Sequence, residues 1–439
     1  MLRTRLPALA AAAALALVSP TTARTDGTQP TAPLAPALET SPLERVTFDE
    51  AVRRATERNP TVGQAAQAIL RAQAQLDRTR SVFFPLVDGS VGSTILDDAR
   101  GFDGNITQPR TQSAFSATLS YSFLAAARWA EKNHAADRLG TVRISAEETR
   151  RQVAFGAAQS YLAVIATKRT RDISMRNRDT AKALAEYSRA RLAAGQGSRL
   201  NHVRSSQELA TAEGLLQLTE LAVREAQEAL GIALFADDPI DASGDAALRL
   251  AALPPHDDAW LSQRPDVRLS VAELQAAERV VSDSWKSWLP TGTASFTPRY
   301  VTPAGLFEPS KTWRALFQLE IPIYDGTLGA TKRVRIADRE TARLRLAAVK
   351  ARARSELRLA QEAVLRCEQI LASSREAADN AGEALRITEI AYKAGATSNI
   401  EVVQAQQAAR NLEIVAAQAE DRLQQARLDL LVALGQFPQ

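Results

Sequence analysis

The chain has 439 residues, of which 45% are hydrophobic, 24% are charged and only 5% are aromatic. Helical-bundle membrane proteins need repeated apolar stretches of about 20 residues, and none follows the N-terminal segment. The 54 basic and 50 acidic residues are interspersed, so no block of positive charge favours nucleic-acid binding. The low aromatic content and the abundance of Ala, Leu, Arg, Gln and Glu predict long helices.

Residues 1–23 have the pattern of a cleavable secretory signal peptide. Arg3 and Arg5 precede an apolar run from Leu6 to Val18, which small residues follow. The run is short for a membrane span, and a Pro-rich linker over residues 24–46 comes after it. A retained N-terminal anchor is the alternative interpretation. The only cysteine, Cys367, lies within a predicted helix, so we expect no disulfide framework.

The sequence predicts an internal twofold repeat. Matching positions lie 205 residues apart near the start of each half and 200 residues apart further on. The pairs are Asn59-Pro60 with Arg264-Pro265, Ala194-Gly195 with Ala394-Gly395, and Ser198 with Ser398. Because the offset falls from 205 to 200, the first half is predicted to be five residues longer than the second half in the segment between these matches. The predicted repeats span residues 47–240 and 257–436, and a linker over residues 241–256 joins them.

Each half is predicted to contain a strand hairpin, at residues 82–123 and 291–323. Apolar and polar residues alternate from Phe115 to Phe123, and less regularly from Trp313 to Ile323. Polar loops over Asp97–Gln112 and Thr302–Lys311 are predicted to join the strands. This alternation suits a lipid-facing barrel strand, although a half-buried strand of a soluble sheet has the same pattern. Four strands cannot enclose a lumen, so the lipid interpretation requires several chains to share one barrel.

The rest of each half is predicted to form a long helical hairpin, over residues 126–235 and 327–434. From Ala126 to Ala190 there is no Pro and little Gly, and a helix of roughly 65 residues would be about 95 Å long. A heptad seam of Ala and Leu runs from Val402 to Ala433, and it recurs 200 residues earlier from Leu209 to Ala233. The seam predicts close packing, in a two-stranded coil or in a wall of many helices.

Both helical hairpins are predicted to turn at a glycine. Gly195 and Gly395 occupy the position at which a left-handed residue ends a helix. Ser198 and Ser398 follow at the N-cap positions of the returning helices. In the second half, Ser398 to Glu401 has the form of a capping box, in which Glu401 accepts a hydrogen bond from a free backbone N–H. Such tips are exposed and suited to docking a partner.

In this order and spacing, the features resemble the TolC-like outer-membrane efflux protein family over residues 47–434. The most specific residues are Arg264-Pro265-Asp266-Val267 leading to Ala272-Glu273-Leu274, Leu289-Pro290, and the Gly395 turn followed by Ser398 to Val403. The resemblance implies a mostly α fold with a β-barrel contribution. It implies a homotrimer in which four strands per chain build one 12-stranded transmembrane β-barrel, and in which the helical hairpins continue as a trimeric α-barrel through the periplasm.

The resemblance also implies a function. The chain would be a passive exit duct in the outer membrane, connected through a periplasmic adaptor to an inner-membrane pump and serving multidrug-type efflux. Type I protein secretion and metal efflux are alternatives, and a periplasmic coiled-coil adaptor or scaffold is an alternative of a different class. We assign no catalytic residue, cofactor or metal ligand, because His134, His202 and His256 are scattered and no nucleophile–base pair is evident.

In the family, acidic side chains ring the periplasmic entrance just after the second hairpin turn. Glu401 occupies the first such position here, and the uncharged Gln404 occupies the second. Three copies of Glu401 would form an anionic constriction, whose mutual repulsion raises the pKa and which attracts cations. A capping role alone is the alternative for Glu401. Tyr392 matches a position that helps to hold the entrance closed, and simple packing is its alternative.

Overall fold

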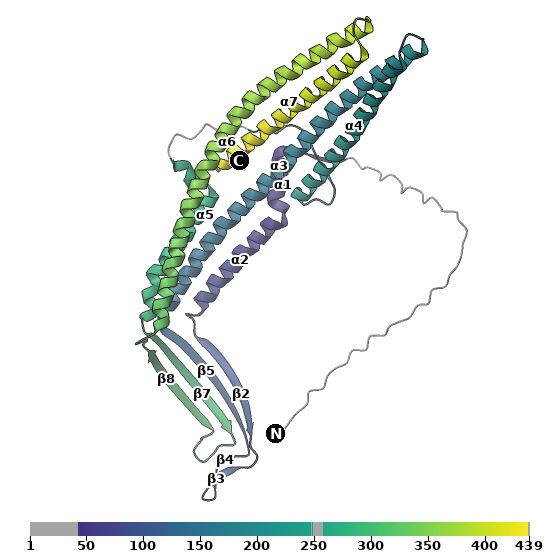
Figure 1. The fold of residues 1–439 in the computed structure, drawn as a ribbon. Helices are drawn as coiled ribbons and strands as arrows, with labels where there is room; N and C mark the ends of the chain where they lie inside the picture. Colours follow the sequence, from purple (N-terminus) through teal and green to yellow (C-terminus); the bar gives the residue numbers. More distant parts are fainter. Residues whose placement is uncertain (1–42, 247, 249–257, 438–439) are drawn as a thin grey trace, which may run out of the picture. The chain divides into compact units, whose positions relative to one another are not determined.

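The computed structural model describes residues 43–246, 248 and 258–437. The predicted signal peptide, the N-terminal linker up to residue 42 and most of the 241–256 linker lie outside the described residues. Within the described part, a four-stranded sheet continues directly into long helices (Figure 1). No described helix is both long and apolar enough to cross a membrane.

The first half contains a short strand, two helices, two sheet strands with a small hairpin between them, and two long helices. In chain order these are β1 (Glu44–Val46), α1 (Phe48–Arg58), α2 (Pro60–Ser81), β2 (Leu86–Ile95), β3 (Arg100–Phe102), β4 (Asn105–Gln108), β5 (Thr111–Ala125), α3 (Ala126–Ala193), α4 (Arg199–Leu234) and β6 (Ile240–Ala242). The predicted unbroken helix after Ala126 is confirmed, because α3 runs for 68 residues, or about 100 Å.

The second half follows a similar order. It contains the 3-10 helix η1 (Asp258–Gln263), α5 (Pro265–Ser282), the 3-10 helix η2 (Asp283–Trp288), β7 (Thr291–Thr302), β8 (Lys311–Glu320), α6 (Gly326–Lys393) and α7 (Asn399–Ala433). Helix α6 also has 68 residues. The two long helices of each half therefore correspond in length, with 68 and 36 residues in the first half and 68 and 35 in the second, while the internal sequence repeat stays a prediction.

The main sheet is antiparallel, with the strand order β2-β5-β7-β8. Strands β5 and β7 join the two halves, with Leu119 opposite Phe296. The predicted strand from Trp313 to Ile323 is too long, because β8 ends at Glu320. Pro322 lies just beyond this end and has no N–H to donate to a neighbouring strand. The outer edges of β2 and β8 have no partner strand among the described residues.

Two small sheets were not predicted. Strands β3 and β4 form a hairpin inside the segment predicted as a loop over Asp97–Gln112. Strand β1 pairs in parallel with β6, which brings together residues that the sequence placed largely in the two linkers. Strands of three or four residues are too short to show a period-two pattern, which is why the sequence did not reveal them.

The helices form a wall in the same order as the strands. Near the sheet, α3 lies between α2 and α5, and α5 packs against α6. Near the hairpin tips, α3 lies between α4 and α7, and α7 packs against α6. Helices α3 and α6 therefore run the full length of the wall. Each of the other two positions holds a pair of shorter helices, α2 followed by α4 and α5 followed by α7 from the sheet to the tips (Figure 1).

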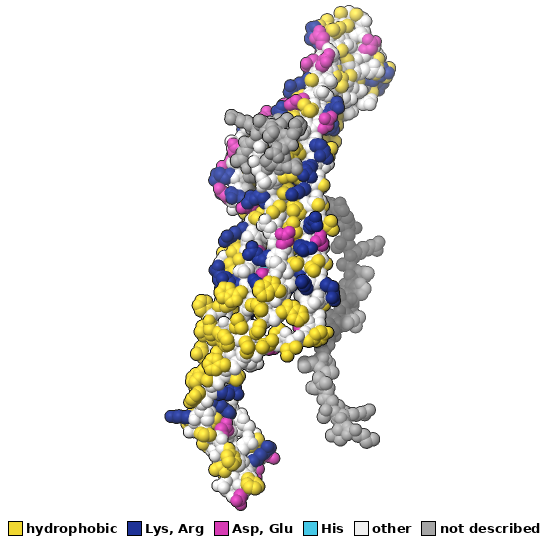
Figure 2. All heavy atoms as spheres, turned by 90° about the vertical axis from the view of Figure 1, so that its left-hand side faces the viewer, with side chains coloured by type: hydrophobic (Ala, Val, Ile, Leu, Met, Phe, Trp, Pro, Cys, Tyr) yellow, Lys and Arg dark blue, Asp and Glu magenta, His cyan; other side chains and the backbone are white. Residues whose placement is uncertain are grey.

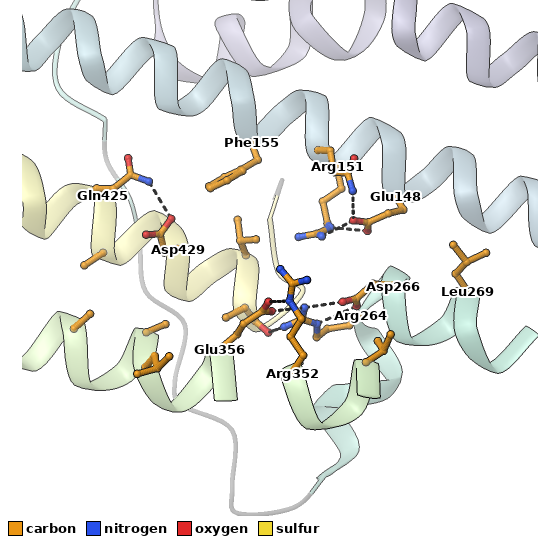
Figure 3. A pocket seen from close by; sticks show the side chains of 18 of the residues that line it. Glu148, Arg151, Phe155, Arg264, Asp266, Leu269, Arg352, Glu356, Gln425 and Asp429 are labelled. Atoms are coloured by element: carbon orange, nitrogen blue, oxygen red, sulfur yellow. Dashed lines mark hydrogen bonds and ion pairs between the residues drawn. The ribbon is translucent and has the colours of Figure 1, made fainter. Parts of the chain in front are cut away.

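Polar side chains join these shorter helices end to end. Arg264 is 5% exposed, and its guanidinium donates three hydrogen bonds. The acceptors are the Ala433 carbonyl at the end of α7 (3.1 Å), Asp266 at the start of α5 (2.7 Å) and Glu356 on α6 (2.8 Å) (Figure 3). Asn59 acts similarly in the first half. Its Oδ1 caps α2 by accepting from Thr61 N (2.9 Å), and its Nδ2 donates to the Ala233 carbonyl of α4 (3.4 Å).

The core lies where these joints meet the middle of the long helices. Small residues on α3, such as Ala154, Ala157 and Ala158, are almost fully buried and allow close approach of α1 and β6. The predicted heptad seam of α7 is buried from Ala419 to Ala433, and its residues nearer the tip are mostly half-buried. The seam is therefore confirmed as a packing face.

Candidate functional site at the tips of the helical hairpins

Both hairpins turn at a glycine in the left-handed region, as predicted. Gly195 has φ +72° and Gly395 has φ +76°. The residue after each glycine donates its N–H back into the last helical turn, Gln196 to the Arg191 carbonyl (2.9 Å) and Ala396 to the Ala391 carbonyl (2.8 Å). This pattern is a Schellman ending, and a residue with a Cβ would be strained at either glycine.

The caps of the two returning helices differ. Ser198 Oγ accepts a hydrogen bond from Leu200 N (3.2 Å), as predicted for an N-cap. Ser398 occupies the predicted N-cap position of α7, but its side chain accepts no N–H of that helix. Its hydroxyl donates to Glu401 Oε1 (3.0 Å), a charge-assisted hydrogen bond. Glu401 does make the hydrogen bond that a capping box requires of it, because its carboxylate also accepts the Ser398 backbone N–H.

Glu401 is exposed on the first turn of α7. Hydrogen bonds from the Thr397 and Ser398 hydroxyls hold the pKa of Glu401 below its ordinary value of 4.5. The carboxylate is therefore ionised at neutral pH in a single chain. Gln404 is also exposed and lies three residues further on, so the two side chains share one face of α7. Their role at an entrance stays a prediction.

Tyr392 is buried at the end of α6, where it contacts the first hairpin. Its ring meets that of Tyr187 on α3 edge-on at 5.8 Å between centroids. The Arg191 guanidinium lies 5.9 Å from both rings, a cation–π arrangement. Leu184, Val402 and Val403 complete this apolar cluster. Tyr392 thus packs against residues of both hairpins and joins them.

Below the tips, side chains of α7 bind side chains of α4 in an arrangement that we call the hairpin seam. Asn399 is 1% exposed and donates to Ser205 Oγ (3.1 Å). Glu208, which is also buried, accepts from Gln407 (2.8 Å) and Arg410 (2.9 Å). The hairpin seam comprises these five residues. The sequence did not single them out, because nothing in a single chain pairs residues that lie about 200 positions apart.

Three further ion pairs join α3 to α7 towards the middle of the wall. Arg176 pairs with Glu413, and Arg169 pairs with both Glu420 and Asp421. A groove of about 530 Å³ lies on the other side of the tip contacts. It is lined by Asp179, Thr180, Ala183, Leu184, Tyr187, Glu389, Tyr392, Lys393 and Val402. The two hairpins are therefore held by a polar seam and an apolar cluster, with an open groove between them.

The described residues hold no group of three or more His, Cys, Asp or Glu side chains that could bind a metal ion. His134 Nε2 pairs with Asp283 (3.1 Å), His202 lies on α4, and His256 lies outside the described residues. The contacts described at the tips hold the helices of the two hairpins together.

Residues 258–436 match the family described as outer membrane efflux protein. The pyoverdine export outer membrane protein OpmQ of Pseudomonas aeruginosa is 25% identical over 416 residues, covering 88% of this chain and 85% of OpmQ. The CmeC outer membrane channel of Campylobacter jejuni has a similar fold (TM-score 0.79, 16% identity, 92% of each chain). So does the MtrE outer membrane channel of Neisseria gonorrhoeae (TM-score 0.76, 17% identity, 88% of each chain).

The fold and these comparisons define an outer membrane transport protein with a large helical part in the periplasm. The predicted resemblance to TolC-like outer membrane efflux proteins is confirmed, because residues 258–436 match that family and OpmQ is similar over most of the chain. Its relatives are channels, a non-enzymatic class, so the prediction that the chain is not an enzyme is confirmed on that ground. The predicted outer membrane location is confirmed in the same way.

Proposed function

We propose that three copies of this chain form a passive exit duct for multidrug-type efflux. A 12-stranded barrel would carry the duct through the outer membrane, and a helical barrel would carry it through the periplasm. The observation that carries this proposal is the open sheet. Both edge strands, β2 and β8, are exposed at every position, and an unpaired edge is not tolerated in lipid.

The helical wall has the same open edges as the sheet. On one edge, α4 exposes Leu218 and Leu221, and on the other edge the tip half of α6 exposes Leu359 and Leu365. These side chains are at least 56% exposed, whereas large apolar residues of this kind are usually buried. Two different edges that meet head to tail generate a closed ring when the rotation closes. Joining β2 to β8 and the α4 edge to the α6 edge would satisfy both layers at once.

The sheet carries the apolar side chains that lipid requires. Val87 and Val91 on β2 are exposed, as are Trp313 and Phe317 on β8. Each pair lies four residues apart and therefore on one face of its strand. Figure 2 shows hydrophobic side chains gathered over the strands and their junction with the helices. Exposed aromatic residues near this junction, Phe84, Trp129, Trp285, Trp288 and Tyr324, fit an interfacial girdle.

In the proposed duct the hairpin tips form the periplasmic entrance. The hairpin seam and the Tyr187–Tyr392 contact would hold α7 against the first hairpin in the closed form. Opening would separate these contacts and move Glu401 and Gln404 away from the axis. A periplasmic adaptor would dock at the tips around Gly195, Ser198, Gly395 and Ser398, and would connect the duct to an inner-membrane pump. The groove beside Tyr392 provides a recess for such a partner.

The similarity to OpmQ favours a second candidate cargo. OpmQ is described as exporting pyoverdine, so this chain would export a secreted small molecule of that kind. Type I protein secretion and metal efflux are the remaining alternatives for the same duct. In each case the pump selects the cargo.

Native mass spectrometry of protein extracted from outer membranes tests the assembly. Three copies per particle are expected, because four strands per copy then close a 12-stranded barrel. A monomer that fractionates with soluble periplasmic proteins would support the adaptor or scaffold hypothesis instead. Deleting the gene and comparing the export of toxic compounds with that of siderophore-like molecules separates the two candidate cargoes.

A further inference from the structure

Four large apolar side chains are exposed on the loops at the end of the sheet remote from the helices. Phe102 and Ile106 lie on the β3–β4 hairpin, and Leu306 and Phe307 lie in the loop between β7 and β8. Phe102 and Phe307 are each 82% exposed. We call these four residues the apolar loop cluster. Exposed apolar groups of this size commonly mark an interaction surface.

The loops that carry the cluster have defined conformations. Phe102 precedes a two-residue turn in which Asp103 and Gly104 both have positive φ, the geometry that tightens a β-hairpin. Leu306 and Phe307 form the tip of a turn closed by two backbone hydrogen bonds between Gly305 and Glu308 (3.1 and 3.2 Å). The apolar side chains are therefore presented at fixed positions.

The two loops are also fastened to each other. Gln112 Nε2 donates to the Pro303 carbonyl (3.3 Å) and to Glu308 (3.1 Å). The backbone of Gly305 approaches the Thr107 carbonyl so closely that a Cβ would lie 2.5 Å from its oxygen. Only glycine fits at that position. The apolar loop cluster thus belongs to one platform, although its halves come from loops about 200 residues apart.

Charged neighbours argue against a lipid partner. Asp97, Asp98, Arg100 and Asp103 are exposed in the first loop. Inserting Phe102 and Ile106 among acyl chains would bring these charges towards the hydrocarbon, which is unfavourable. A protein surface with apolar side chains among polar ones suits these loops better than lipid does. The same loops on another copy of the chain form such a surface.

The two loops lie beside the two free edges of the sheet. The first loop leaves the edge strand β2, and the second loop enters the edge strand β8. In the ring proposed above, β2 of one copy pairs with β8 of its neighbour. This pairing would bring Phe102 of one copy towards Phe307 of the next, around a single outer mouth.

We propose that the apolar loop clusters of neighbouring copies pack against one another and close the outer mouth of the duct with an apolar constriction. This inference rests on the proposed ring of copies. Narrow apolar constrictions resist ion flow because water leaves them readily. The duct would then have an outer closure that cargo must part, in addition to any closure at the hairpin tips.

Cysteine cross-linking tests the contact. In a Cys367→Ser background, the double variant Phe102→Cys/Phe307→Cys is treated with a mild oxidant in outer membranes. Cross-linked dimers and trimers are expected on a denaturing gel. The matched control Asp98→Cys/Phe307→Cys, which replaces an exposed residue of the same loop, is expected to stay monomeric. Monomers from both variants, or equal cross-linking of both, overturn the proposed contact.

Single-channel recording tests the closure. The variant Phe102→Ser/Phe307→Ser is expected to raise the conductance about twofold or more over the unaltered protein. Unchanged conductance overturns the closure even if cross-links form. Quenching of a fluorophore at position 102 by brominated lipids would identify lipid as the partner and overturn the proposal. If the unaltered protein forms no channel at all, the exit duct fails; a conducting protein without cross-links contradicts only the outer closure.

Discussion

Arg264 donates a hydrogen bond to the carbonyl oxygen of Ala433, and this 3.1 Å contact joins the start of α5 to the end of α7. A helix end leaves carbonyl groups without partners, so a buried end needs a donor from elsewhere. Arg264 supplies that donor and also ties the joint to Glu356 of the continuous helix α6. Two short helices thereby extend the wall in place of one long helix.

Replacing Arg264 by Ala is expected to destabilise the protein. The change leaves Asp266 and Glu356 without their buried cation and the Ala433 carbonyl without its donor. The side chains of Asp266 and Glu356 are 29% and 36% exposed, so water compensates part of the loss, and the expected cost in the free energy of unfolding is about 1–3 kcal/mol. Chemical denaturation followed by circular dichroism measures this change. The control Arg352→Ala removes an exposed partner of Glu356 and is expected to cost about 1 kcal/mol or less.

Breaking the hairpin seam is expected to open the periplasmic end. Glu208→Gln removes the charge that holds Arg410 and Gln407, so α7 separates more easily from α4. The expected result is a higher single-channel conductance or a larger open fraction. Arg386→Ala is the matched control, because Arg386 pairs with Glu383 within α6 and across no boundary. Equal behaviour of both variants would mean that the seam plays no part in closure.

Glu401 is expected to set the cation preference of the entrance. Its carboxylate is ionised at neutral pH, since the hydroxyls of Thr397 and Ser398 lower its pKa. Glu401→Gln should reduce the ratio of cation to anion permeability, and Gln404→Glu should increase it. Reversal potentials across a salt gradient report both changes. If neither variant moves the reversal potential, Glu401 serves only as a helix cap.

The contact between α3 and α7 is expected to respond to pH through Asp421. Burial raises the pKa of Asp421 to about 6. Repulsion from Glu420 and Asp245 adds to this rise, and the attraction of Arg169 does not offset it. The folded state therefore binds this proton more tightly than the unfolded state. The resulting stabilisation is full below pH 3.8, the ordinary pKa, and is lost as the pH rises through about 6.

Asp421→Asn isolates this effect, since it fixes the uncharged form and keeps a hydrogen-bonding side chain. The variant should gain about 2–3 kcal/mol in stability over the unaltered protein at pH 8, and the gain should shrink towards pH 4. Thermal unfolding across this pH range provides the comparison. Carboxylates whose pKa is lowered, such as Asp241 and Asp266, make the folded state less stable as the pH falls. They do so equally in both proteins, so their effect cancels when the two stabilities are subtracted. A gain that does not vary with pH would exclude titration of Asp421.

The long elements were predictable because each carries a pattern many residues long. The Ala and Leu of the α7 seam repeat through ten positions, and the alternation from Phe115 to Phe123 has only one periodic interpretation. Gly195 and Gly395 were predictable for a local reason, since their left-handed backbone strongly favours glycine.

The contacts between elements were not predictable. Arg264 was recognised as part of a motif, but its bonds to Ala433 and Glu356 depend on where three helices meet. The Glu208–Arg410 pair depends on how α7 crosses α4. Ser398 occupies the expected N-cap position, but its hydroxyl donates to Glu401 and accepts no N–H of α7, a detail of side-chain geometry that the sequence does not reveal. Three-residue strands such as β1 exist only because another strand lies beside them.

The most direct test of the exit duct is the current through purified protein in a planar lipid bilayer. The protein is expected to insert and to produce discrete conductance steps of uniform size, because one particle would form one continuous water-filled path. A bilayer that shows no steps at protein densities confirmed by immunoblotting would contradict the duct.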